Sequence, residues 1–274
     1  MRESSETSQT PDAGAPRAQP YVGSSSQAVP YAVSRDVGDP SAMADAPTPA
    51  PVSTAPFAAH VGAKPGAIVL VSALAGLSCF GAIGQVTKTM GWFLSQDWSW
   101  ADSAIRTASY LTNLTIVLSA CCFVCVLLAM TSLKRWLPEW TYRPSVVTAV
   151  TLYLAFVGCG YNLLLRGYWV PVGIRAVLNE VVHTVVPILA VVYWIFFVPR
   201  FALDARRIWL WLIYPLGYLF ATLWHGHLSD FYPYPFINVE RIGFDHVLRN
   251  AAGLIVGFLI LMGLFLLINH RRRE

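Results

Sequence analysis

The sequence predicts an all-α, polytopic membrane protein with six transmembrane helices and a disordered N-terminal tail. Hydrophobic residues make up 55% of the 274 residues and charged residues only 12%, whereas soluble domains carry about 25% charged residues. Too little polar surface remains to cover a core that faces water. The apolar residues also gather in six uncharged stretches, all of them after residue 64. These observations exclude an ordinary soluble protein.

The first 64 residues have a different composition from the rest of the chain. They hold four basic and six acidic residues, are rich in Pro, Ala, Ser, Gln and Thr, and show no helical apolar period. Such a segment cannot bury enough apolar area to offset the loss of chain entropy, so it is predicted to be disordered. It also lacks the apolar region of a secretory signal peptide. The predicted domains are therefore a tail over 1–64 and a six-helix transmembrane domain over 65–274.

Each uncharged stretch is long enough to cross, or nearly cross, a hydrocarbon core of about 30 Å as a helix. A helix is expected because a membrane-spanning segment must satisfy its backbone hydrogen bonds internally. The fifth stretch is the shortest, and Pro215 and Gly217 are expected to bend it. The six stretches are 66–86, 107–133, 144–165, 181–199, 208–224 and 250–269.

The positions of Lys and Arg near the ends of these stretches predict the orientation. If the N-terminus is inside, ten basic residues lie on the inner side and six on the outer side, which places both termini in the cytoplasm. The inner set is Lys64, Lys134, Arg135, Arg143, Arg200, Arg206, Arg207, Arg271, Arg272 and Arg273. The outer set is Lys88, Arg106, Arg166, Arg175, Arg241 and Arg249.

The expected partners are membrane lipids, and no cofactor is predicted. The net charge of +4 is modest, and no basic run in a folded region has the spacing of a nucleic-acid site, so nucleic-acid binding is not expected. Gly253 and Gly257 form a GxxxG pattern in the sixth stretch. This pattern would permit a homodimer through the sixth helix, and it is equally compatible with packing inside one chain.

Two polar groups stand inside predicted membrane spans. His183 lies in the fourth stretch, and an ionisable residue there indicates a functional site because burying it in lipid is unfavourable. Thr112, Thr115 and Ser119 form a polar stripe at the spacing i, i+3 and i+7 in the second stretch. The alternative interpretation of both groups is structural, with His183 bonding a neighbouring helix and the stripe serving helix packing.

Topology brings Thr112 and His183 to a similar depth. Both spans enter from the outer side in the predicted orientation, so a hydroxyl and an imidazole on separate helices could form a nucleophile–base pair. Glu180, three residues before His183, is expected to orient its ring, as the third member of a catalytic triad does. Asn113 or Asn179 could donate a hydrogen bond to an oxyanion, and the sequence does not choose between them.

A second cluster follows the fifth stretch. His225, His227 and Asp230 could bind zinc and activate water, although no spaced pair such as HExxH is present. The histidines also fit an interfacial loop. The segment 232–236, Tyr-Pro-Tyr-Pro-Phe, is predicted to form an ordered lid or plug, because its prolines forbid a helix and its rings suit the headgroup depth.

The order and placement of several short motifs resemble the androgen-induced-protein family, which includes the androgen-dependent regulator of tissue factor pathway inhibitor. The matching segments are Tyr110-Leu111-Thr112 and His183-Thr184-x-x-Pro187, and 214–218 with 232–236 are similar to bacterial six-span relatives. The resemblance covers roughly 66–269. The animal pattern has one more residue between its histidine and its proline. The resemblance implies a threonine hydrolase of fatty acid esters of hydroxy fatty acids, with Thr112 as nucleophile and His183 as base.

The sequence therefore leads to the hypothesis of a membrane lipid-ester hydrolase with a fatty-acyl ester as substrate and Thr112 and His183 as catalytic residues. A non-catalytic membrane protein, such as a small-solute transporter or a lipid-binding partner protein, is the main alternative. A transporter would be expected to show internal repeats or paired broken helices, and the sequence has no convincing repeat. A zinc-dependent membrane hydrolase built on the histidine cluster is a further alternative.

Overall fold

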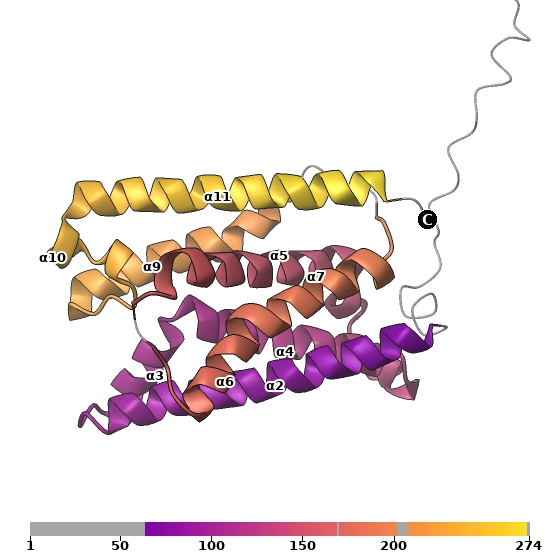
Figure 1. The fold of residues 1–274 in the computed structure, drawn as a ribbon, viewed down its shortest axis with the longest axis horizontal. Coiled ribbons are helices and arrows are strands. Elements are labelled where there is room, and N and C mark those ends of the chain that lie inside the picture. The colour runs from indigo at the N-terminus through magenta and orange to yellow at the C-terminus, as the bar shows by residue number, and fades with distance from the viewer. Residues whose placement is uncertain (1–63, 169, 202–207, 273–274) are drawn as a thin grey trace, which may run out of the picture. The chain divides into compact units, whose positions relative to one another are not determined.

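The structure is a computed structural model, and it describes residues 64–168, 170–201 and 208–272 (Figure 1). The tail predicted for 1–64 lies outside these residues except for Lys64, so its disorder stays a prediction. Within the described part, every regular element is helical and there is no strand. The prediction of an all-α protein is thus confirmed for this part of the chain.

Five helical runs are long and apolar enough to cross a membrane. Three of them are α2 (Pro65–Leu94), α4 (Leu111–Ala129) and α11 (Phe244–Arg271). Two are composite: α5 (Pro144–Gly160) continues into the π-helical turn η4 (Tyr161–Leu165), and α6 (Ile174–Glu180) continues through the π-helical turn η5 (Val181–Val185) into α7 (Val186–Phe197). The chain is therefore an integral, multi-pass membrane protein.

The predicted fifth span differs from the others. The 3₁₀ turn η6 (Trp209–Leu212) leads into α9 (Ile213–Ser229), which has only 17 residues and is about 26 Å long at 1.5 Å per residue. The bend expected at Pro215 and Gly217 stays a prediction. The chain changes from 3₁₀ to α just before Pro215, which stands in the first turn of α9, where its missing N–H is tolerated. The Tyr153 hydroxyl of α5 donates to the Trp211 carbonyl, four residues before the proline, at 3.0 Å.

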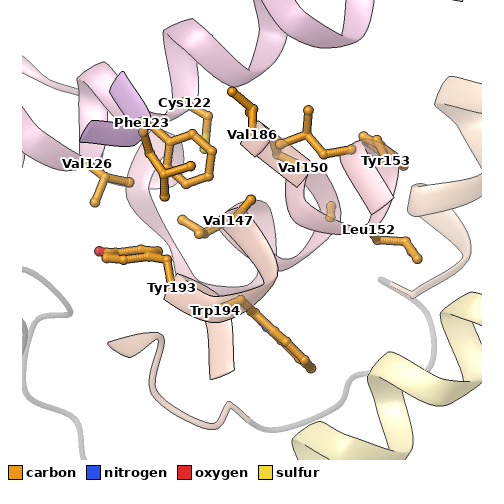
Figure 2. Close-up of a cluster of buried hydrophobic side chains, with 14 of the residues drawn as sticks. Cys122, Phe123, Val126, Val147, Val150, Leu152, Tyr153, Val186, Tyr193 and Trp194 are labelled. Carbon is orange, nitrogen blue, oxygen red and sulfur yellow. The ribbon is translucent and has the colours of Figure 1, made fainter. Parts of the chain in front are cut away.

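The helices pack around an apolar core. α4 lies against α2 and α5, α7 lies against the same two helices, and α11 lies against α5. Figure 2 shows part of this core, with Phe123 of α4, Val150 of α5 and Trp194 of α7 among its buried side chains. The Trp194 indole donates to the Thr148 hydroxyl at 2.8 Å, so its buried N–H is satisfied inside the bundle.

The outer surface of these helices is also apolar. Val69, Ile83, Phe220 and Ile260 are each about 70% exposed. Lipid solvates such side chains, whereas contiguous apolar patches of this kind are rare on soluble monomers. Gly253 and Gly257 belong to this surface as well, since a Cβ atom on either would meet nothing within 4 Å. The GxxxG pattern is therefore not explained by packing inside the chain, and the homodimer stays a prediction.

Short helices gather at one end of the bundle, away from the C-terminal end of α11 (Figure 1). They are α3 (Trp100–Ala108), the 3₁₀ turn η7 (Pro235–Ile237) and α10 (Val239–Ile242). Arg106 of α3 is buried, and its guanidinium lies 3.6 Å from the Trp98 ring centroid and 4.5 Å from that of Phe231. These cation–π contacts fasten the loop before η7 to α3.

Candidate functional site

Thr112 and His183 meet at the same end of the bundle. Thr112 is half-buried in the first turn of α4, and His183 is buried in η5. The Thr112 Oγ1 atom lies 3.2 Å from Nε2 of His183. The structure therefore brings together the two residues that the sequence singled out, and their contact is within hydrogen-bond range.

The second ring nitrogen of His183 determines which way this hydrogen bond runs. Nδ1 lies 3.0 Å from the backbone oxygen of Asn179. A carbonyl can only accept a hydrogen bond, so the proton of the neutral imidazole is assigned to Nδ1. Nε2 is then an acceptor, and the Thr112 hydroxyl donates to it. This is the tautomer that a base acting on Thr112 needs.

The widened turn around His183 follows from Pro187. Proline has no N–H, so the carbonyl of His183, four residues earlier, loses its helical partner. The Asn162 amide of η4 replaces that partner, donating to the His183 carbonyl at 3.1 Å and to the Gly158 carbonyl at 2.8 Å. Gly158 permits the close approach of α5, because a Cβ atom there would stand 3.0 Å from the His183 oxygen. The two π-helical turns thus lie together, at the kind of position where π-bulges are often functional.

Glu180 does not orient the imidazole as the sequence analysis expected. Its carboxylate forms an ion pair with Arg166 at 2.8 Å and accepts a hydrogen bond from the Thr184 hydroxyl at 2.9 Å. The π-helical turn changes the residue spacing, so a side chain three residues before His183 no longer lies beneath its ring. The backbone carbonyl of Asn179 takes the orienting position instead.

Tyr161 completes the support of the imidazole, and the sequence analysis missed it. Its ring stacks on that of His183 with the centroids 3.9 Å apart and the planes 21° from parallel. Its hydroxyl accepts a hydrogen bond from the Asn179 side chain at 2.7 Å. No local pattern marks Tyr161, since it reaches the site only through the packing of η4 on η5.

Neither asparagine proposed for an oxyanion has its amide directed to Thr112. The Asn113 amide donates to the Thr107 carbonyl at 2.9 Å, and the Asn179 amide donates to Tyr161. The other members of the polar stripe bond to other helices. Thr115 lies 2.8 Å from the Tyr214 hydroxyl, and Ser119 lies 2.8 Å from the Ser78 hydroxyl. Thr115 and Ser119 therefore hold helices together, which agrees with the alternative interpretation that the polar stripe serves helix packing.

A cavity of about 690 Å³ opens beside the pair. It is lined by Thr112 and His183 and by side chains of α2, α6 and the 232–236 segment. A narrower apolar crevice of about 100 Å³ runs between α5, α9 and α11. Thr112, Tyr161 and Tyr234 line both spaces. Thr112 thus stands at the junction of a wide cavity with some polar side chains in its wall and a narrow apolar crevice.

Tyr234 covers this junction. Its ring lies edge-on to Tyr110 at 5.9 Å and stacks on Phe236 at 5.3 Å. Thr112 and Tyr218 lie near its phenol, and burial raises the pKa of Tyr234 above its ordinary value. The phenol therefore stays protonated near neutral pH and can act as a donor. The 232–236 segment, which the sequence predicts to be an ordered lid or plug, lines the cavity through Pro233, Tyr234 and Pro235.

The histidine cluster after the fifth stretch is separate from this site. The two ring nitrogens of His225 lie 3.3 Å from the hydroxyls of Ser109 and Ser229. Within the described ranges, no group of three His, Cys, Asp or Glu side chains is placed to hold a metal ion. The arrangement that His225, His227 and Asp230 suggested for zinc is thus not formed by these residues.

Comparisons of the chain with protein-family models, with curated proteins and with solved structures found no match.

Proposed function

We propose that this protein is a membrane lipid-ester hydrolase in which Thr112 is the nucleophile and His183 the base. The observation that carries the proposal is the 3.2 Å contact between the Thr112 hydroxyl and Nε2 of His183, with Nδ1 engaged by the Asn179 carbonyl. A threonine hydroxyl is a weak nucleophile until a base accepts its proton. The arrangement provides that base in the required tautomer.

The reaction would proceed in two steps. Thr112 Oγ1 attacks the ester carbonyl while its proton passes to Nε2 of His183. The tetrahedral intermediate collapses, the C–O bond to the alcohol breaks, and His183 returns the proton to the departing alcohol. Water then attacks the acyl-threonine with His183 again accepting a proton, which releases the carboxylic acid and restores the Thr112 hydroxyl. The Asn179 carbonyl stabilises the imidazolium through Nδ1–H at both steps.

The two spaces around Thr112 fit an ester with a long acyl chain. The crevice is lined by apolar side chains such as Phe156, Leu216 and Phe258, and it can take the hydrocarbon chain. Such a substrate would enter from the membrane. The resemblance of the motifs around Thr112 and His183 to the androgen-induced-protein family, whose animal members are threonine hydrolases, agrees with this proposal.

We also propose that the chain has six spans and that both termini lie in the cytoplasm. Residues 208–229 form one continuous helical run when η6 and α9 are joined, which is long enough for a sixth crossing. The excess of basic residues on the side of the termini supports the orientation. The site would then lie in the outer half of the bilayer, and a reporter fused at Ser229 should read as external.

Turnover of a long-chain ester tests the proposal. Thr112→Ala and His183→Ala should each abolish turnover, and the double variant should be scarcely worse than either single variant, since members of a catalytic unit are strongly non-additive. Thr115→Ala is the matched control, because Thr115 lies one turn deeper on the same stripe and its hydroxyl lies 2.8 Å from that of Tyr214. Activity that survives Thr112→Ala would discard this mechanism. Wild-type protein without any ester turnover would favour a lipid-binding or transport function.

A further inference from the structure

Arg166 joins the two π-helical turns of the site. It directly follows η4, and its Nε atom donates to Oδ1 of Asn162 in that turn at 2.7 Å. Its Nη2 atom donates to the carboxylate of Glu180 at 2.8 Å and to the hydroxyl of Thr184 at 3.2 Å. Glu180 stands directly before η5, and Thr184 stands within it. One guanidinium therefore bonds to both turns at once, which its planar fork of donors allows.

The contact with Arg166 fixes the orientation of the Asn162 amide. A guanidinium has only donors, so the atom of Asn162 that faces it is the oxygen. The nitrogen is then the atom that meets the carbonyls of Gly158 and His183, at 2.8 and 3.1 Å. The reversed amide would place its oxygen against two carbonyl oxygens and its nitrogen against the guanidinium, where no hydrogen bond can form. Arg166 thus selects the orientation in which Asn162 donates to His183.

The hydrogen bond from Asn162 bears on the imidazole because the His183 carbonyl belongs to the backbone that carries the ring. Pro187 leaves this carbonyl without a helical partner, and Asn162 supplies the replacement. The ring is tied to the same turn through Nδ1, which lies 3.0 Å from the Asn179 carbonyl, so a shift of the turn moves the ring with it. Nε2 lies 3.2 Å from Oγ1 of Thr112, and a misplacement of about 1 Å can slow a reaction about 100-fold.

The ion pair with Glu180 is a separate contact of Arg166. Both side chains are nearly half exposed, and an ion pair that is so exposed contributes little to stability. The bond to Asn162 uses a different nitrogen, Nε, and does not need the carboxylate. Replacing Glu180 therefore removes the charge pairing alone, whereas replacing Arg166 also removes the contact that orients Asn162.

We propose that Arg166 is a positioning residue for His183. Its guanidinium holds the Asn162 amide against the His183 carbonyl and thereby keeps the imidazole in line with Thr112. Arg166 is not among the side chains that line the cavity beside Thr112, so it acts through Asn162 and not on the substrate. Its effect on turnover rests on the proposed hydrolase, whereas its effect on the ring does not.

The test combines the kinetics of long-chain ester turnover with ¹⁵N NMR of the imidazole, on full-length protein in detergent above neutral pH, where the ring is neutral. In the wild type, protonated Nδ1 and unprotonated Nε2 of His183 should give two well-separated signals, which His183→Ala assigns. Arg166→Gln should bring these signals closer together, because the ring is no longer held in one tautomer. The same variant should lower kcat at least about tenfold and keep KM within about twofold. Arg166→Lys keeps the charge without the fork of donors and should behave like Arg166→Gln.

Glu180→Gln is the matched control, since it removes the ion pair and leaves the contact between Arg166 and Asn162. It should leave the two His183 signals apart. The double variant of Arg166→Gln and Asn162→Leu should be scarcely worse in kcat than Asn162→Leu alone, because Arg166 acts through Asn162. Unchanged signals in Arg166→Gln, an equal effect of Glu180→Gln, or additive losses in the double variant would each overturn the positioning role. Absence of ester turnover in the wild type, with signals that still respond to Arg166→Gln, would count against the hydrolase alone.

Discussion

The two ends of the helix bundle treat buried polar groups differently. In the core of α4, α5 and α7, part of which Figure 2 shows, most buried side chains are apolar, and several hydroxyls bond a carbonyl of their own helix. The Thr151 hydroxyl, for example, donates to the Val147 carbonyl at 2.8 Å in its own helix. At the cavity end, polar groups from different helices depend on one another, as Asn162 and His183 do.

We infer that the apolar end contributes mainly to stability and that the cavity end holds the reactive groups. Removing one member of a buried polar network leaves its partners unpaired and lowers the free energy of unfolding. An apolar core tolerates substitutions by apolar residues of similar volume. Pro187 and Pro215 each free a carbonyl four residues earlier. The first accepts a hydrogen bond from Asn162 of η4 and the second from Tyr153 of α5. Only the Asn162 bond lies next to His183. Substitutions at the two ends should therefore separate stability from activity.

The largest loss of stability is expected from Phe123→Ala in the apolar core. Phe123 is fully buried and packs edge-on against Tyr193 at 6.0 Å. The cavity left behind should lower the free energy of unfolding by about 3 kcal/mol. This value is at the low end for Phe→Ala substitutions, because lipid rather than water solvates the separated helices. Thermal unfolding in detergent would measure this loss. Turnover per folded molecule should stay near wild type, and a large loss of specific activity would break the separation of the two ends.

An intermediate effect is expected from Asn162→Leu at the cavity end. The His183 carbonyl would lose its donor, which should lower the free energy of unfolding by about 1–3 kcal/mol and reduce turnover as the imidazole loses its position. Pro187→Ala restores the missing N–H four residues after His183, so the double variant should regain part of the lost stability. A double-mutant cycle measures this coupling. Additive effects of the two substitutions would show that Asn162 does not compensate for Pro187.

The smallest effect is expected from Glu180→Gln. Glu180 and Arg166 are each nearly half exposed, so their ion pair is worth at most about 1 kcal/mol. Turnover should fall by no more than about fivefold, because the Asn179 carbonyl and not Glu180 orients the ring. A loss comparable to that of His183→Ala would restore Glu180 to the role that the sequence analysis gave it.

The sequence was sufficient for the parts of this account that depend on helical periodicity and depth. Uncharged stretches located the long helices, and counting residues from the span ends brought Thr112 and His183 to the same depth. The orienting role predicted for Glu180 was wrong, because that prediction assumed the residue spacing of a regular α-helix. The π-helical turn at Val181–Val185 arises from Pro187 together with a donor on another helix. Tyr161 and Asn162 reach His183 only through tertiary packing, which no local pattern encodes.

The most direct test of the central claim is covalent labelling of the wild-type protein with a fluorophosphonate probe, followed by mass spectrometry of the digested chain. Such a probe reacts with a hydroxyl that an adjacent base activates. We expect one adduct, on Thr112, and we expect it to disappear in His183→Ala while folding is retained. Absence of an adduct, or an adduct on another hydroxyl such as Ser109 beside His225, would contradict the assignment of Thr112 and His183 as the catalytic pair.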